Sequence, residues 1–82
     1  MNLKEILEGI PQLTERERRV LSLRYDEHGN TIMTLANIGR EIGVSRERIR
    51  VNEMKALHKL RHPLIRRDHQ ELAGFISARV MK

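Results

Sequence analysis

Residues suited to capping the start of a helix recur along this chain, and each is followed by an apolar pattern of helical spacing. They are Asn2, Thr14, Thr34 and Ser45. A glutamate lies three positions after Asn2 and another lies three positions after Thr14, which is the spacing of a capping box. No segment alternates apolar and polar residues as a half-buried strand does. The capping pattern therefore predicts an all-α fold.

The predicted fold is a small bundle of about five short helices in a single domain, residues 1–82. With 82 residues, no cysteine, one tyrosine and one phenylalanine, the chain must build a thin core from aliphatic side chains. We expect a first helix between Asn2 and Gly9, a second from Thr14 to about Arg24, a helix-turn-helix at 34–61 and a C-terminal helix at about 64–79.

The helix-turn-helix prediction depends on two glycines. Gly43 lies between two helical patterns, where a left-handed backbone conformation lets the chain turn sharply. Gly39 lies inside the first of these helices at a cost of about 1 kcal/mol relative to alanine. A close approach of the second helix would offset that cost. Ile38, Ile42 and Val44 would then form a buried seam with Ile49. An ordinary corner between two helices, without a role in DNA binding, is the alternative.

Positive charge is concentrated in the second half of the chain. Residues 1–45 hold six basic and seven acidic side chains, whereas residues 46–82 hold ten basic and four acidic ones. Such asymmetry favours a face that meets a polyanion such as nucleic acid. A solvated helix face is the alternative explanation.

The helix that follows Ser45 begins with three arginines and a glutamate within five positions. In a helix-turn-helix protein, these first residues reach base edges in the major groove. Arginine can donate to O6 and N7 of guanine, and glutamate can accept from the cytosine amino group. We expect one face of this helix to present Arg46, Glu47, Arg50 and Val51. Pairing of Glu47 with Arg50, and of Glu53 with Lys55 or Arg50, is a compatible alternative.

Residues 13–63 resemble region four, the C-terminal domain of sigma-70 family sigma factors of bacteria. The resemblance lies in LTERERRVLSLRY (13–25), TLANIGREIGVSRERIR (34–50) and E-x-KAL-x-KLRHP (53–63). It implies binding to the promoter −35 element in double-stranded DNA and docking on the flap of the RNA polymerase β subunit. An anti-sigma factor or a transcription activator is a further candidate partner.

The resemblance also assigns roles to residues. Base contacts fall on Arg46, Glu47, Arg50 and the adjoining Val51. Contacts to the DNA backbone fall on Arg16, Arg24, Thr34, Leu35 and Arg48. An activator would face Lys55, His58, Lys59 and Arg61.

The chain departs from the family at Val51-Asn52, where Gln-Ile is usual. Val51 on the DNA face could only make apolar contact, for which the thymine methyl group is the natural target. Asn52 would fall on the buried stripe and need a hydrogen-bond partner. Alternatively, a small rotation of the helix leaves Asn52 at the boundary and half-buries Val51. After Pro63 the resemblance fades, and the domains that a complete sigma factor needs are absent from this sequence.

Other functions have little support. Four histidines do not converge with carboxylates at the spacing of a metal site, so no metal or other cofactor is expected. No phosphate-binding loop or catalytic triad pattern is visible, so the chain is not expected to be an enzyme. No apolar stretch suits a membrane span or a signal peptide. We expect a soluble cytoplasmic protein of a bacterium, or of a phage acting in one.

Two further hypotheses remain beside promoter binding. One is a protein-interaction module that mimics region four and binds the polymerase flap, an anti-sigma factor or an activator. The other is the output domain of a LuxR-type regulator, which also begins with LT-x-RE-x-x-VL, although RERIR and KLRHP argue against it.

Overall fold

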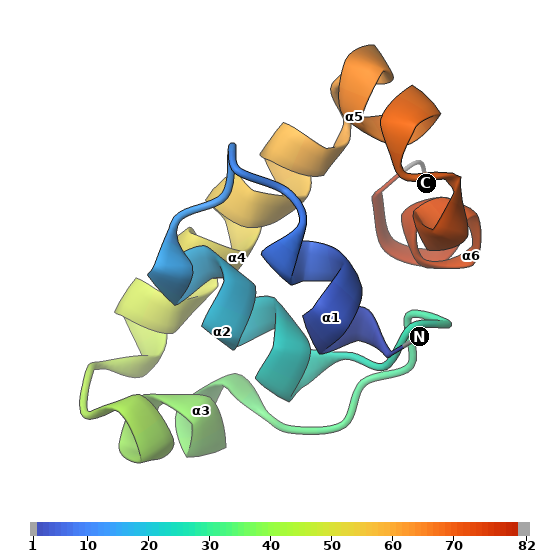
Figure 1. Ribbon diagram of the computed structural model, residues 1–82. Helices are drawn as coiled ribbons and strands as arrows, with labels where there is room; N and C mark the ends of the chain where they lie inside the picture. The colour runs from blue at the N-terminus through green and yellow to red at the C-terminus, as the bar shows by residue number, and fades with distance from the viewer. Residues whose placement is uncertain (1, 81–82) are drawn as a thin grey trace.

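The computed structural model describes residues 2–80, and these residues form helices joined by turns and loops, without strands (Figure 1). The predicted fold class is confirmed. Residues 1, 81 and 82 of the predicted domain lie outside the described residues. The elements in chain order are α1 (Leu3–Glu8), α2 (Glu15–Arg24), α3 (Leu35–Ile42), α4 (Arg46–Leu60), α5 (Pro63–Asp68), a 3-10 turn (Gln70–Leu72), α6 (Ala73–Phe75) and a π-helical turn (Ile76–Val80).

Each of the first four helices begins at the predicted cap. The Thr14 hydroxyl accepts from the backbone N–H of Glu17, whose carboxylate accepts from the backbone N–H of Thr14, so the capping box is complete. Asn2, Thr34 and Ser45 each accept a backbone N–H three residues ahead. The helix starts are therefore determined locally, within one turn of chain.

The turn between α3 and α4 confirms the expected role of Gly43, and it corrects the partner expected for Gly39. Gly43 has a φ of 86°, in the left-handed region. A methyl group on Gly39 would lie 2.7 Å from the carbonyl oxygen of Val44, so the close approach comes from the turn itself. Of the expected seam, Ile38 and Ile49 are fully buried, whereas Ile42 and Val44 are half-buried against them.

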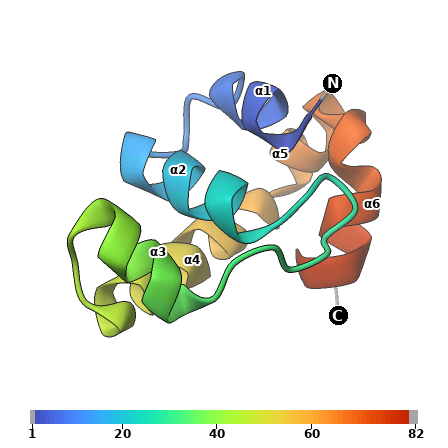
Figure 2. The same ribbon diagram turned by 90° about the horizontal axis from the view of Figure 1, so that it is seen from below.

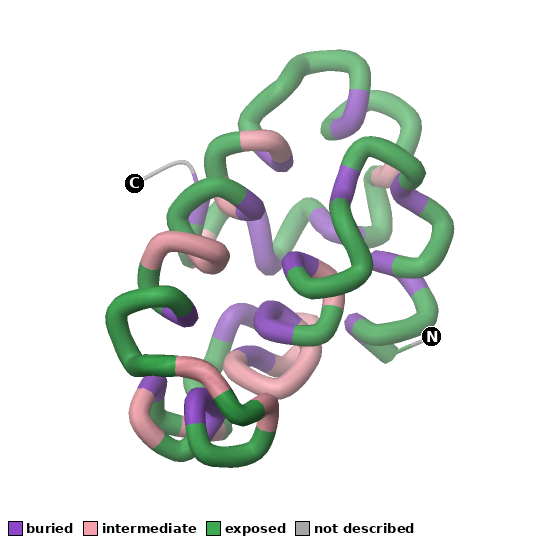
Figure 3. Tube along the Cα trace, turned by 90° about the vertical axis from the view of Figure 1, so that its left-hand side faces the viewer, coloured by how far each residue is buried: buried purple, intermediate pink, exposed green. Residues whose placement is uncertain are grey.

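Two apolar clusters hold the helices together, with buried positions on their inward sides (Figure 3). The smaller cluster lies under the helix-turn-helix and consists of Val20, Leu35, Ile38 and Ile49. The larger one joins α1 to the C-terminal part of α4 and to the segments that follow. Helices α2 and α4 contribute to both clusters, so they are the frame on which α3 is placed.

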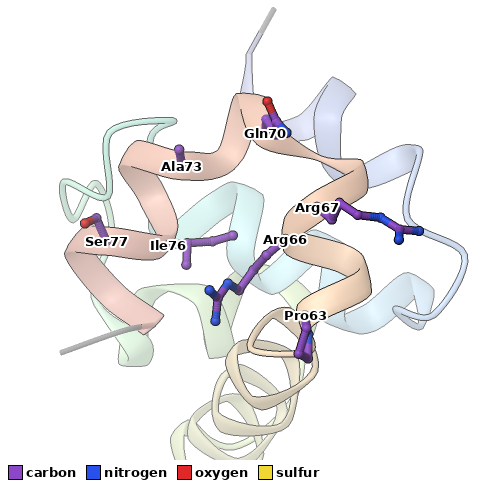
Figure 4. Close-up of a pocket in the computed structure, with 7 residues that line it drawn as sticks. All are labelled: Pro63, Arg66, Arg67, Gln70, Ala73, Ile76 and Ser77. Carbon is purple, nitrogen blue, oxygen red and sulfur yellow. The ribbon is translucent and has the colours of Figure 1, made fainter.

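The expected single C-terminal helix at about 64–79 is wrong. Helix α5 ends at Asp68, and His69 has non-helical backbone angles of φ −129° and ψ 61°. This break turns the chain so that Leu72 and Phe75 pack in the larger cluster together with Ile65. Burial of these side chains outweighs the local preference for a continuous helix. A hollow remains between α5 and the last segment, and the side chains of Arg66 and Ile76 extend toward it (Figure 4).

The loop between α2 and α3 reaches across to the C-terminal segment (Figure 2). Arg79 donates from Nε to the carbonyl oxygen of Gly29 at 2.6 Å, and its guanidinium lies 5.1 Å from the ring centre of Tyr25. The Phe75 and Tyr25 rings pack edge to face, and their centres are 5.5 Å apart. The C-terminal segment thereby holds the loop that leads into α3.

Candidate nucleic-acid interface

The first turns of α4 present their polar side chains to solvent. Arg46, Glu47 and Arg50 are exposed, while Ile49 among them is fully buried in the smaller cluster. Burial of Ile49 sets the rotation of α4, and the helix geometry then directs its neighbours outward. The structure thus places these three predicted base-contacting residues on the surface at the start of α4.

Glu47 and Arg50 form an ion pair on this surface. Arg50 donates from Nε and from Nη2 to the Glu47 carboxylate, at distances between 2.7 and 3.0 Å. The hydrogen bond from Arg50 holds the pKa of Glu47 below its usual range, and the same bond raises the pKa of Arg50. Because a guanidinium has five N–H donors, the edge formed by Nη1 remains available to a base. The pair predicted within α4 is confirmed for these two residues.

The other predicted ion pair has a different partner. Glu53 accepts from Nε of Arg24 at 2.6 Å, not from Lys55 or Arg50. Arg24 also donates to the carbonyl oxygen of Met33 at 2.9 Å, directly before the cap of α3. Its side chain is only 19% exposed. Arg24, which the resemblance places on the DNA backbone, is therefore half-buried and links α2 to α4 and to the end of the loop before α3.

The N-terminus of α3 offers backbone N–H donors. Thr34 is exposed and caps the helix, whereas Leu35 is buried in the smaller cluster. Any contact of Leu35 with a phosphate must therefore use its backbone N–H, which the first turn of a helix leaves without an intrahelical partner.

A shallow groove of about 320 Å³ lies between the start of α2 and the outer side of α4. Val51 and Asn52 both line it and are both half-buried. Of the two alternatives for this departure from the family, the structure shows the boundary position of Asn52. Among residues 2–80, its side chain has no hydrogen-bond partner. The remaining residues that line the groove are Arg16, Ser45, Glu47, Arg48 and Lys55.

The residues expected to face an activator divide into two groups. Lys55 and His58 are exposed on α4, and Arg61 is exposed just beyond its end. Lys59 instead donates to the Glu17 carboxylate at 2.7 Å and is 35% exposed. Sequence patterns could not reveal this pair, because its members lie 42 residues apart.

Neither a metal site nor a membrane span appears in the part of the chain that the structure describes. Residues 2–80 contain no cluster of three or more histidine or acidic side chains that could hold a metal ion. None of the helices formed by these residues is long and apolar enough to cross a membrane.

A family model described as sigma-70, region 4 matches residues 9–62, which is more than half of the chain. The chain belongs to the sigma-70 region 4 family. This is a non-catalytic family, and region 4 binds the −35 promoter element in transcription initiation. The α3–α4 unit and its exposed arginines lie inside the matched region.

Curated relatives support this membership. The RNA polymerase sigma factor RpoD of Neisseria gonorrhoeae is 55% identical over 60 residues, which are 73% of this chain and 9% of the relative. The RNA polymerase sigma factor SigA of Listeria monocytogenes is 53% identical over 62 residues, which are 74% of this chain and 17% of the relative. The chain thus spans less than a fifth of the length of these bacterial sigma factors, and corresponds to a short region 4 piece.

Proposed function

We propose that this chain binds double-stranded promoter DNA at a −35 element and acts together with RNA polymerase. The observation that carries the proposal is the exposed Arg46, Glu47 and Arg50 surface at the start of α4, within a region 4 frame. Arg46 and Arg50 would read guanines, and ionised Glu47 would accept from a cytosine amino group. Val51 would contact a thymine methyl group.

Backbone contacts would surround this base-reading surface. Arg16 and Arg48 are exposed cations on α2 and α4, and the first turn of α3 supplies backbone N–H groups. We assign Arg24 a supporting role, because its guanidinium is already bonded to Glu53 and to Met33. A contact between Arg24 and phosphate would need that network to open.

Arg46→Ala and Arg50→Ala test the proposal. Each variant should lose about 1–3 kcal/mol of binding free energy and relax the preference at one base pair. The measurement is fluorescence anisotropy at low salt, with a −35 duplex and its single-base-pair variants. Arg67→Ala is the matched control, because that side chain is 71% exposed on α5 and pairs only with Asp68 among described residues. Full base preference in the Arg46 variant would contradict the groove assignment.

Binding by the free chain should be weak, because one small module covers little DNA. A tether to polymerase, for which the β-subunit flap is the proposed anchor, would raise the effective concentration. The same anisotropy titration with polymerase core enzyme present should therefore show tighter specific binding. Tight, salt-resistant specific binding by the chain alone would count against this part of the proposal.

A second candidate function is docking of a protein partner, such as the flap, an anti-sigma factor or an activator. A groove of about 490 Å³ at the junction of α4 and α5 favours it. Leu64 is 51% exposed at this groove, and His58 and Arg61 lie beside it. An exposed leucine ringed by basic groups suits an acidic partner with an apolar contact.

A further inference from the structure

The groove between α2 and α4 gathers positive charge that the protein itself does not neutralise. Arg16 lines it from α2, and Arg48 and Lys55 line it from α4. Among residues 2–80, none of these three side chains has an ion-pair or hydrogen-bond partner. Glu47 is the acidic residue that lines the groove, and its carboxylate is already ion-paired with Arg50. Three unpaired cations around one hollow favour an anionic occupant.

Asn52 adds an uncharged donor to the same groove. It is half-buried beside Val51, and its side chain makes no hydrogen bond within residues 2–80. Every fully buried side-chain nitrogen or oxygen in that range has a hydrogen-bond partner. Since the Asn52 amide has none, it is not fully buried and is accessible from the groove. An amide group supplies two N–H donors, which suit a phosphate oxygen.

We propose that this groove binds one phosphate of the DNA backbone, with Asn52 donating a hydrogen bond and Arg16, Arg48 and Lys55 supplying the charge. The inference rests on the proposed DNA-binding function and deepens it, because it turns the family departure at Asn52 into a contact. It also places Lys55 on the DNA side of α4, about two turns after Arg48 in the helix.

A salt titration of the full chain with a −35 duplex separates the contribution of charge to DNA affinity from the contribution of hydrogen bonding. One neutralised phosphate adds about 0.9 to the slope of log affinity against log salt, so Arg48→Ala and Lys55→Ala should each flatten that slope by a part of this value. Asn52→Ala should lower affinity by about tenfold and leave the slope unchanged, because asparagine carries no charge. Lys4→Ala on α1, which lines a different groove, is the control and should leave the slope unchanged.

A scan of single methylphosphonates along the duplex backbone identifies the phosphate itself. Wild-type affinity should fall at every contacted phosphate, but the Asn52→Ala loss should disappear at only one of these positions or at two adjacent ones. Asn52→Ile, which installs the usual family residue, should repeat this result. Two results would overturn the proposal. One is that the affinity loss from each Asn52 variant adds to the affinity loss from the methylphosphonate at every position. The other is that both Asn52 variants bind DNA as tightly as wild type.

The experiment also separates this proposal from the one that it depends on. Failure of wild type to bind any duplex at low salt would overturn both. Binding with an Arg46-dependent base preference, but with no methylphosphonate position coupled to Asn52, would overturn the phosphate site alone.

Discussion

At the scale of single residues, Glu17 is a buried carboxylate held by several contacts at once. Its carboxylate is only 4% exposed, accepts from the backbone N–H of Thr14 and binds Lys59 at 2.7 Å. Burial alone would raise the pKa of Glu17, but the hydrogen bonds from Lys59 and Thr14 outweigh burial, so the pKa lies below the ordinary 4.5. One residue therefore caps α2 and ties α2 to the end of α4.

This pKa predicts a pH dependence of stability. Because the folded pKa is below the unfolded one, the unfolded state binds more protons, and the stabilisation is complete above about pH 5 and lost as pH falls through the folded pKa. Glu17→Gln keeps an oxygen for the cap but removes the charge. It should lower the free energy of unfolding at pH 7 by roughly 1.5–3 kcal/mol and flatten the decline of that free energy as the pH falls below about 5. Urea unfolding at several pH values measures both effects.

Glu15→Gln is the control for this prediction, since Glu15 is exposed in the same first turn of α2. Its stability profile should run parallel to that of wild type. A Glu17→Gln profile that also ran parallel would show that Glu17 does not couple folding to protonation.

At the scale of elements, the turn between α3 and α4 determines where the base-reading surface lies. Gly43 adopts the left-handed conformation, and Gly39 allows the Val44 carbonyl to approach the body of α3. Arg24 adds a link from α2 to the end of the preceding loop and to Glu53. The relative position of α3 and α4 thus depends on backbone contacts as well as on the apolar seam.

Gly39→Ala tests this arrangement. Alanine is favoured over glycine inside a helix by about 1 kcal/mol, but its methyl group would meet a carbonyl oxygen at 2.7 Å. We expect a net loss of about 1–3 kcal/mol in the free energy of unfolding, as for other overpacked sites. Gly74→Ala in α6 is the control, because a methyl group there meets nothing within 4 Å. Equal or greater stability of Gly39→Ala would contradict the close approach.

At the scale of the whole molecule, the segment after residue 62, beyond the family match, packs back on the region 4 body. Arg79 bonds to Gly29 and Thr31 in the loop before α3, and Phe75 packs against Tyr25. A methyl group on Gly29 would lie 2.8 Å from Cβ of Ala78, so loop and segment are in close contact. The last turns therefore support the loop that positions α3.

Arg79→Ala should loosen this support. We expect faster hydrogen exchange at the amides of residues 26–33 and a loss of about 1–2 kcal/mol in the free energy of unfolding, from two charge-assisted hydrogen bonds and one cation–π contact. Hydrogen exchange followed by mass spectrometry measures the first effect. Arg67→Ala should change neither quantity. Unchanged protection of the loop in Arg79→Ala would show that the loop is held without the C-terminal segment.

The sequence by itself determined the helix starts, the turn at Gly43 and the basic surface of α4. The caps and the turn are contacts between residues three to five apart, and a helix face follows from its period, so a short stretch of sequence contains all the partners involved. The family resemblance rested on the same local segments. For this reason the local pattern was sufficient to place Arg46, Glu47 and Arg50 together on one exposed surface.

Only the tertiary structure decided the break at His69, the pairs Arg24–Glu53 and Glu17–Lys59, and the boundary position of Asn52. Each of these depends on how distant segments meet. The chain turns at His69, and Ile65 before the turn and Phe75 after it pack in the same cluster. The two ion pairs form because α2 packs against α4. Such contacts arise from burial of apolar surface over the whole molecule, which no local pattern encodes.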